Sequence, residues 1–513
     1  KRLSEDDPSV AKKRKQKLSK DELLAIIATH ERTSLGGENG ELSNQRAEAL
    51  KRYYGEPYGD EVEGRSSVIS KDVADAVDWI MPSLMRIILS TDRPVEFDPV
   101  EAEDEQAAEQ ESDYVNYVIM KRNPGFLFIH DWVKDGLLLK NGYVKRWWDE
   151  TEEVSHETYG TLTEEEVILT LQQLEAEGDE IEIVEQASET VFNDLGQPVE
   201  VFEIKVRRTR MTGKVKIEPT PPEELLISNR LRAQIEESDF VQHNTTKRRW
   251  ELIEMGMNAE FVDSLPTWSG KQDEADIRRD QLSDEERAGS VSIIDRSMDE
   301  IEYKETVLRV DWDGDGIAEL RRVVIAGNQI PDGAEWNREI DGVPYSSWTP
   351  NRMPHRHIGL SIQDALSDIA RIKTQLLRLS LDNTYLLTNL EWLGNERVQV
   401  SDFLTTRPGG LKRILGKEPV EGAAKAVERP PILQHILPVL DYMDTVKESR
   451  AGVNRNLMGL DADTLKKTTE GAARQALQQV NVRIEMIARL FAETGFKDLA
   501  LAVRALSIKH NPR

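Results

Sequence analysis

The chain has 513 residues, of which 38% are hydrophobic and 31% are charged, with a formal net charge of −27 at pH 7. It contains no cysteine, which excludes disulfides, thiolate metal sites and cysteine nucleophiles. The length predicts several domains, because single hydrophobic cores stop growing beyond roughly 250–300 residues.

The charge is unevenly distributed along the chain. Residues 351–513 carry 24 Lys and Arg against 18 Asp and Glu, a net of +6, which leaves −33 on the remainder. Either the acidic part is a solubilising surface, or the two parts face different environments.

No apolar run approaches the ~20 residues that span a bilayer, and no signal peptide is visible, so we expect a soluble protein made inside the cell, without a membrane partner. The chain begins without methionine and ends abruptly, and we expect trimming at both ends.

The first 69 residues have the pattern of an N-terminal arm. A basic cluster, "AKKRKQK", precedes a helix over residues 19–33 with Ser19 as its N-cap. The basic run is typical either of a nucleic-acid-binding tail or of a disordered terminus.

From residue 70 a second helix is predicted, because apolar residues recur at helical spacing. These residues are Val73, Val77, Ile80, Leu84 and Ile87.

Residues 150–330 have mostly strand character, with one helical insert at "LTEEEVILTLQQLEAEG". Near the end of this region, "VLRVDWDGDGIAELRRVVIAG" places acidic residues at the spacing of a calcium-binding loop. Positions 1, 3, 5, 7 and 9 of that pattern fall on Asp311, Asp313, Asp315, Ile317 and Glu319, with Ile317 offering its carbonyl.

This acidic loop departs from the helix–loop–helix calcium site. Position 12, which needs a bidentate glutamate, is Arg322, and both flanks read as strands. We therefore predict a β-hairpin turn that either holds a structural Ca²⁺ or Mg²⁺ or uses its Asp side chains to cap backbone N–H groups. A catalytic metal is disfavoured, because no nearby group supplies an acid or a base.

The C-terminal third predicts two long helices around a small mixed segment. The first is a helix of about 28 residues within 359–388, about 42 Å long at 1.5 Å per residue, and the second covers residues 431–455. A helix of this length cannot be hidden in one small core, so we expect its sides to pack on neighbouring subunits.

His355 and His357, just before the first helix, could ligate a metal, but a hinge or subunit contact is the simpler interpretation.

No enzyme motif occurs in the chain. "SLGGENG" lacks the lysine of a phosphate-binding loop, and neither G-x-S-x-G nor H-E-x-x-H is present. We therefore predict that the protein is not an enzyme and requires no cofactor. Two alternatives stay open: a metal-dependent enzyme such as a nuclease, and an acidic calcium-stabilised binding module.

Four blocks, in order, resemble the portal proteins of short-tailed double-stranded-DNA bacteriophages. They are "RSSVISKDVADAVDWIMPSLMRI", "PPEELLISNRLRAQIEESDFVQH", "MPHRHIGLSIQDALSDIARIKTQLLRLSLDNTYL" and "RPGGLKR". The resemblance covers most of residues 60–505 and rests on the order of the blocks. It implies a mixed α+β portal fold with an α/β wing, two long stem helices, a small α/β clip and C-terminal helices. The implied segments are 1–69 (arm), 70–350 (wing), 351–388 (first stem helix), 389–432 (clip), 433–455 (second stem helix), 456–469 (tunnel loop) and 470–513 (wing and crown helices).

The resemblance also implies a function and partners. It implies a ring, usually of twelve subunits, at one capsid vertex of the virion, assembled in the host cytoplasm. Double-stranded DNA would pass through its axis without sequence specificity during packaging and ejection. The implied protein partners are the terminase packaging motor, tail adaptor proteins, and capsid and scaffolding proteins. Few helices remain after Gly495, so the crown is expected to be short or missing.

Basic residues of the C-terminal third are the candidates for these contacts. In the implied tunnel loop and just after it, Lys466, Lys467 and Arg474 are the predicted DNA contacts, because cations there neutralise phosphates transiently. In the implied clip, Arg397, Arg407, Lys412 and Arg413 are the predicted docking residues. A solvated surface or an ion pair between subunits is the alternative for each.

Overall fold

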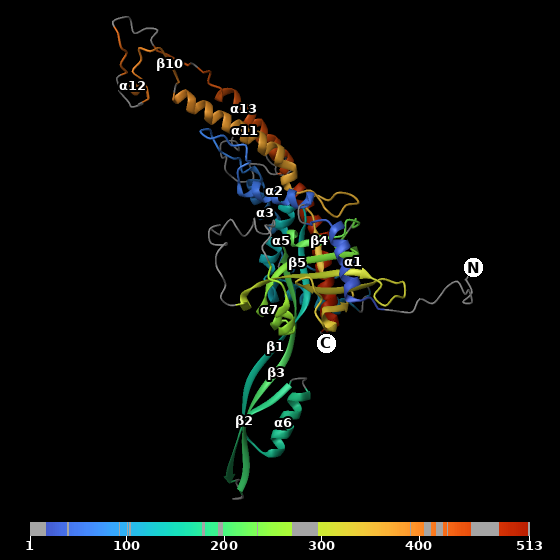
Figure 1. The fold of residues 1–513 in the computed structure, drawn as a ribbon. Helices are drawn as coiled ribbons and strands as arrows, with labels where there is room; N and C mark the ends of the chain where they lie inside the picture. The colour runs from blue at the N-terminus through green and yellow to red at the C-terminus, as the bar shows by residue number, and fades with distance from the viewer. Residues whose placement is uncertain are drawn as a thin grey trace, which may run out of the picture.

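The computed structural model describes residues 17–510, apart from 38–39, 92, 100, 102–103, 177–179, 193–197, 233, 269–295, 390, 405–411, 417–423, 428 and 453–481. A central body carries a pair of long helices at one end and a β-arm at the other (Figure 1). Helices and strands are both abundant, so the predicted mixed α+β class is confirmed. Among the described residues, no helix is long and apolar enough to cross a membrane.

Helices that pack around one large apolar cluster form the core of the body. They are α2 (Glu41–Tyr54), α3 (Asp72–Ile88), α4 (Glu105–Tyr117), η2 (Val118–Arg122), α5 (Gly125–Leu139), η8 (Ala492–Phe496) and α16 (Lys497–His510). The apolar face expected on α3 is largely confirmed, since Val73, Val77, Ile80 and Leu84 are buried. Ile87, expected on the same face, is exposed, because it lies in the last turn of the helix.

A five-stranded antiparallel sheet forms the second layer of the body, in the order β4-β5-β6-β7-β8. Its strands are β4 (Leu225–Ile227), β5 (Phe240–Arg248), β6 (Glu300–Val310), β7 (Glu319–Ala326) and β8 (Asn337–Glu339). The predicted hairpin around the acidic loop is confirmed, because β6 and β7 pair from Tyr303↔Ala326 to Val310↔Glu319. Short helices flank this sheet: η3 (Pro222–Glu224), η4 (Ile235–Glu237), α7 (Arg249–Glu254), α8 (Ala259–Ser264), η5 (Arg296–Met298) and η6 (Ala334–Trp336).

Helix α1 (Lys20–Thr33) packs on this sheet. Ser19 caps it as expected, with a reciprocal capping box to Glu22. Leu23 and Ile27 are buried against the sheet beside Phe240. The helices α1 and α2, which the sequence places in the N-terminal arm, are therefore part of the packed body where the structure describes them.

A second sheet, in the order β2-β3-β1-β9, links the body to the β-arm (Figure 1). It contains β1 (Gly142–Leu162), β2 (Glu180–Phe192), β3 (Pro198–Thr220) and β9 (Tyr345–Trp348). β1 and β3 are antiparallel from Tyr143↔Thr220 to Leu162↔Phe202, so most of their length extends beyond the body. The predicted helical insert is α6 (Glu164–Ala176).

The helix pair consists of α11 (Ile362–Thr388) and α13 (Leu433–Ala451), which lie side by side and project from the body (Figure 1). Between them in the chain lie β10 (Trp392–Gly394), α12 (Val400–Leu404) and β11 (Ala424–Ala426), at the far end of the pair. The first helix matches its prediction closely. The second was expected to reach residue 455, but α13 ends at Ala451, because Gly452 adopts a left-handed conformation that terminates the helix.

Candidate functional site

The helix pair is anchored in the body by the first half of α11. Ser361 caps this helix in a reciprocal capping box with Asp364. Ile362, Leu366 and Ile369 are buried in the large core cluster. The second half of α11 leaves the body, so α11 acts as a rigid connection between the core and the far end.

A buried ion cluster fixes the base of the helix pair. Asp72, at the start of α3, is almost fully buried and accepts hydrogen bonds from Lys447 at 2.7 Å and Lys373 at 2.8 Å. Lys373 also donates to Asp444 at 2.5 Å. Burial raises the pKa of Asp72, but the hydrogen bonds from Lys373, Lys447 and Ser70 outweigh it and hold the pKa below its ordinary value. The cluster therefore ties α3, α11 and α13 together through ionised groups.

Residues 58–70 form a strap along α11. Arg378 of α11 donates to Asp60 at 2.7 Å and also to Glu61, and Ser66 donates its N–H to Asp382 at 2.6 Å. Desolvation opposes ionisation of Glu61, yet the hydrogen bonds from Arg378 and from backbone N–H groups lower its pKa to about 2. The strap thus covers one side of the projecting helix.

Other sides of the helix pair expose large apolar side chains. Tyr385 of α11 is 63% exposed and Tyr442 of α13 is 64% exposed. Nothing among the described residues covers these side chains, and exposed apolar surface of this kind indicates an interaction site. The further members are Ile372, Leu379 and Leu381 on α11, and Leu433, Leu437 and Val439 on α13.

The far end of the helix pair, which we call the distal tip, consists of β10, α12, β11 and their connections. It contains three of the four predicted docking residues, and Arg407 lies outside the described residues. Arg413 forms a bidentate ion pair with Asp402 at 2.7 and 3.0 Å, and Lys412 donates to the Asp402 carbonyl at 2.5 Å. The hydrogen bond from Arg413 lowers the pKa of Asp402. These two cations stabilise the tip itself, which the sequence did not indicate.

Arg397 also holds the tip together, since its Nε donates to the Leu415 carbonyl at 3.0 Å. Beside these contacts the tip exposes Trp392, Leu393, Val400 and Leu415.

The predicted DNA contacts Lys466, Lys467 and Arg474 lie in residues 453–481, outside the described part of the chain. Their role stays a prediction.

The acidic loop between β6 and β7 forms a compact turn. Asp311 Oδ1 accepts from the N–H groups of Gly314 (2.8 Å) and Asp315 (3.0 Å), and Asp311 Oδ2 accepts from Gly316 (2.9 Å). Asp315 accepts from Ile317, and Glu319 accepts from Trp312. Ligand atoms of Asp311, Asp313 and Asp315 lie within 4.8 Å of one another, close enough to share a cation. The geometry suits both the metal-bound and the metal-free interpretation.

His357 is buried before α11 rather than grouped with other metal ligands. Its ring stacks on Tyr143, with the Tyr143 hydroxyl 3.2 Å from Nε2. His355 has a positive φ of 62°, which is uncommon for a residue with a side chain. In the described part of the chain, neither histidine joins a cluster of three potential ligands; His357 is packed against Tyr143, whereas His355 is exposed.

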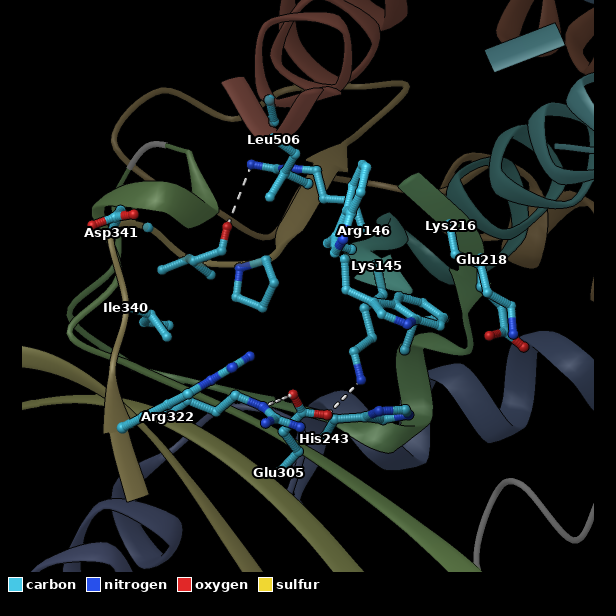
Figure 2. A pocket seen from close by; sticks show the side chains of 18 of the residues that line it. Lys145, Arg146, Lys216, Glu218, His243, Glu305, Arg322, Ile340, Asp341 and Leu506 are labelled. Atoms are coloured by element: carbon cyan, nitrogen blue, oxygen red, sulfur yellow. Dashed lines mark hydrogen bonds and ion pairs between the residues drawn. The ribbon is translucent and has the colours of Figure 1, made fainter. Parts of the chain in front are cut away.

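A cavity of about 1030 Å³ lies between the two sheets and α16. Figure 2 shows Lys145 of β1 and Arg322 of β7 pointing toward the buried Glu305 of β6, with Arg322 Nε 2.5 Å from the carboxylate. Burial opposes ionisation, but the two cations hold the pKa of Glu305 well below its usual range. A carboxylate so strongly neutralised is a poor general base at neutral pH. Lys145 and Glu305 instead join the two sheets.

Sequence reasoning missed both buried ion clusters. Asp72, Lys373 and Lys447 are far apart in the chain, and so are Lys145, Glu305 and Arg322. Each charged residue interrupts an apolar pattern, which is the signal that could have marked it as buried and paired.

A family model described as "Phage SU10 portal protein" matches residues 23–513 of this chain. The curated proteins gave no match.

Proposed function

The chain belongs to the phage SU10 portal protein family, and from this membership we propose that it forms a ring-shaped channel at one vertex of the capsid. Double-stranded DNA would enter through the channel during packaging, be retained there, and leave through it at ejection. Portal proteins are structural components of the virion, which agrees with the absence of catalytic motifs from the sequence.

The observation that supports a ring most directly is the apolar surface of the helix pair. Exposed Leu379, Tyr385, Leu437 and Tyr442 lie on helices that project from the body. In a cyclic assembly, one side of each pair packs on the opposite side of the next, and the contact closes on itself. Burial of apolar area at roughly 25 cal/mol per Å² would stabilise the ring. We propose twelve subunits, the number that the resemblance implies.

We propose that the distal tip binds the terminase packaging motor first and tail adaptor proteins later. Its exposed Trp392 and Leu393 offer apolar anchors. The docking cations would be Arg397, Lys412 and Arg413 at the tip, together with Arg407, which lies outside the described residues. Arg413 and Lys412 would act indirectly, by keeping the tip in shape through Asp402. Capsid and scaffolding proteins would contact the acidic body.

The DNA contacts would be few and without sequence specificity. A strongly acidic protein repels DNA from most of its surface, and cations that neutralise phosphates position the duplex without reading its bases. We propose that Lys466, Lys467 and Arg474 provide these contacts in the tunnel loop. The energy for packaging would come from the separate motor.

Mass photometry and negative-stain imaging of the purified chain test the proposal. We expect closed rings with a mass near twelve times 58.4 kDa and a visible axial channel. A stable monomer at micromolar concentration, together with metal-dependent DNA cleavage, would contradict the portal function and favour the nuclease alternative.

A further inference from the structure

The β-arm ends in a small two-layer unit. The arm is defined here by α6 and the described parts of the strands around it, 154–162 of β1, 180–192 of β2 and 198–209 of β3. α6 contacts all three strands from one face of the sheet (Figure 1). Val167 of α6 packs against Ile204 and Val206 of β3, and both strand residues are fully buried. The arm therefore has a core of its own on this face.

The outer face of α6 carries apolar residues that this core does not use. Ile168 is 52% exposed and Leu169 is 56% exposed. Successive helical residues are rotated by about 100°, so the buried Val167 and Leu174 turn Ile168 and Leu169 away from the sheet. Two adjacent large aliphatic side chains on the outside of a short helix form a candidate contact surface.

The opposite face of the arm sheet has a hollow of about 450 Å³. Side chains alternate along a strand, so Arg207 points to the face opposite Val206 and α6. Exposed apolar side chains of β1 and β2 line the hollow together with polar residues. It is lined by Val154, His156, Glu182, Ile183, Val184 and Arg207.

The two surfaces lie at the same level of the arm. Glu157 pairs with Val206, the residue on which α6 packs, and His156, which lines the hollow, pairs with the adjacent Arg207. The outer face of α6 and the hollow are therefore on opposite sides of the arm, at one height. A head-to-tail contact in a closed ring requires two different patches on opposite sides of the subunit, because rotation about the ring axis brings one side of each copy against the opposite side of the next.

The two surfaces differ in charge, since α6 is purely acidic and the hollow side carries charges of both signs. The α6 sequence, EEEVILTLQQLEA, contains four glutamates and no cation. On the hollow side, Arg207 and Glu182 form an exposed pair 3.6 Å apart, and Lys205 and Glu185 form another at 3.8 Å. Such exposed pairs contribute little to stability, so these cations are available to an acidic helix.

We propose that the arms of neighbouring copies stack head to tail, with Ile168 and Leu169 of one copy seated in the hollow around Val154 and Val184 of the next. The inference rests on the proposed ring and specifies a contact within it. The arms would then form a continuous belt around the assembly, in addition to the contact between helix pairs.

Disulfide trapping tests the contact cleanly, because the chain has no cysteine of its own. Two double variants are made, Leu169→Cys with Val154→Cys and Leu169→Cys with Val184→Cys. In each, the sheet separates the two positions within one chain, so an internal bond is excluded by the short distance that a disulfide requires. After oxidation of assembled rings, we expect at least one variant to give a ladder of cross-linked oligomers on a non-reducing gel.

The single-cysteine variants and their mixture are the matched controls. Each single variant is expected to remain monomeric on the gel, and a mixture of the two singles is expected to stop at dimers, because each chain then links on one side only. Leu169→Cys with Met298→Cys, at an exposed apolar position in the body, should give no ladder. Intact rings without a ladder from either double variant overturn the arm contact alone. Failure of the unmodified chain to form rings overturns the proposed function itself.

Discussion

Asp72 Oδ1 lies 2.7 Å from Lys447 Nζ, where the helix pair enters the body. The two residues are 1% and 4% exposed, so a short ion pair is sealed between α3 and α13. Lys373 of α11 shares the same oxygen at 2.8 Å. One carboxylate in the body thus binds both projecting helices.

Asp72→Asn is expected to lower the free energy of unfolding by about 3–5 kcal/mol, because it leaves buried ammonium groups without their shared anion. Urea denaturation monitored by circular dichroism measures the change. Asp98→Asn, at an exposed position, is the control and should change stability by no more than about 0.5 kcal/mol. A loss below about 1 kcal/mol for Asp72→Asn would show that the cluster does not anchor the pair.

Leu379→Asp combined with Tyr442→Asp is expected to prevent ring formation while the subunit stays folded. Both side chains are more than half exposed on the helix pair, so the fold does not need them, whereas an interface would have to bury two new carboxylates. Mass photometry should show monomers, and the melting temperature should stay close to that of the unmodified protein. Ile253→Asp, at an exposed position of α7, should still form rings. Rings from the double variant would place the interface elsewhere.

Lys466→Glu with Lys467→Glu is expected to impair DNA packaging or retention without preventing ring assembly. Reversal of two cations removes transient phosphate contacts and adds repulsion inside the channel. The amount of nuclease-protected DNA per particle measures the defect, with Lys121→Glu combined with Arg122→Glu, at exposed positions of the body, as a control of the same charge change. Loss of rings in the double variant would assign the loop to assembly instead.

Calcium titration decides between the two interpretations of the acidic loop. If the loop binds Ca²⁺, chelator-stripped protein should release or absorb heat on titration and melt at a higher temperature, because ligand binding to the folded state stabilises it. Asp313→Asn should weaken the response, since it removes a charged ligand but leaves the caps from Asp311 in place. A flat titration with no melting shift leaves the metal-free turn.

Glu236 is expected to make stability fall as the pH rises from about 5 to 8. Burial, together with a hydrogen bond to Asp498, raises the pKa of Glu236 to about 8 from its ordinary 4.5. Between pH 4.5 and pH 8 the folded state therefore keeps a proton on Glu236 that the unfolded state has released. The contribution of this proton to the free energy of unfolding is complete below pH 4.5 and is lost as the pH rises toward 8. Because the group is partly exposed, the loss should be no more than about 1–2 kcal/mol.

The variant Glu236→Gln isolates this effect, because glutamine keeps the hydrogen bond to Asp498 and cannot ionise. Thermal melts of both proteins between pH 5 and 8 should show a smaller dependence on pH in the variant. Parallel curves for the two proteins would mean that Glu236 ionises normally in the folded state.

Local patterns in the sequence predicted the elements that carry most of the architecture. The apolar spacing of α11, the Ser19 cap of α1, the helical insert α6 and the hairpin around Asp311–Glu319 all depend on neighbours within a few residues, and the structure confirms them. The end of α13 was predicted too far along the chain. The spacing of apolar residues does not reveal that Gly452 adopts the left-handed conformation that ends the helix. The order of the four sequence blocks indicated the portal family, and the family match supports it.

What the sequence alone determined, then, is the set of elements, their order and the family, since these depend on short-range periodicity and on motif order. Only the tertiary structure decided which charges are buried and paired: Asp72 with Lys373 and Lys447, and Glu305 with Lys145 and Arg322. It also decided that α1 and α2 pack on the body, and that apolar side chains are exposed on both faces of the β-arm. These features depend on contacts between residues up to 375 positions apart, and the free energy of such contacts is set by burial and distance, which local sequence patterns do not record.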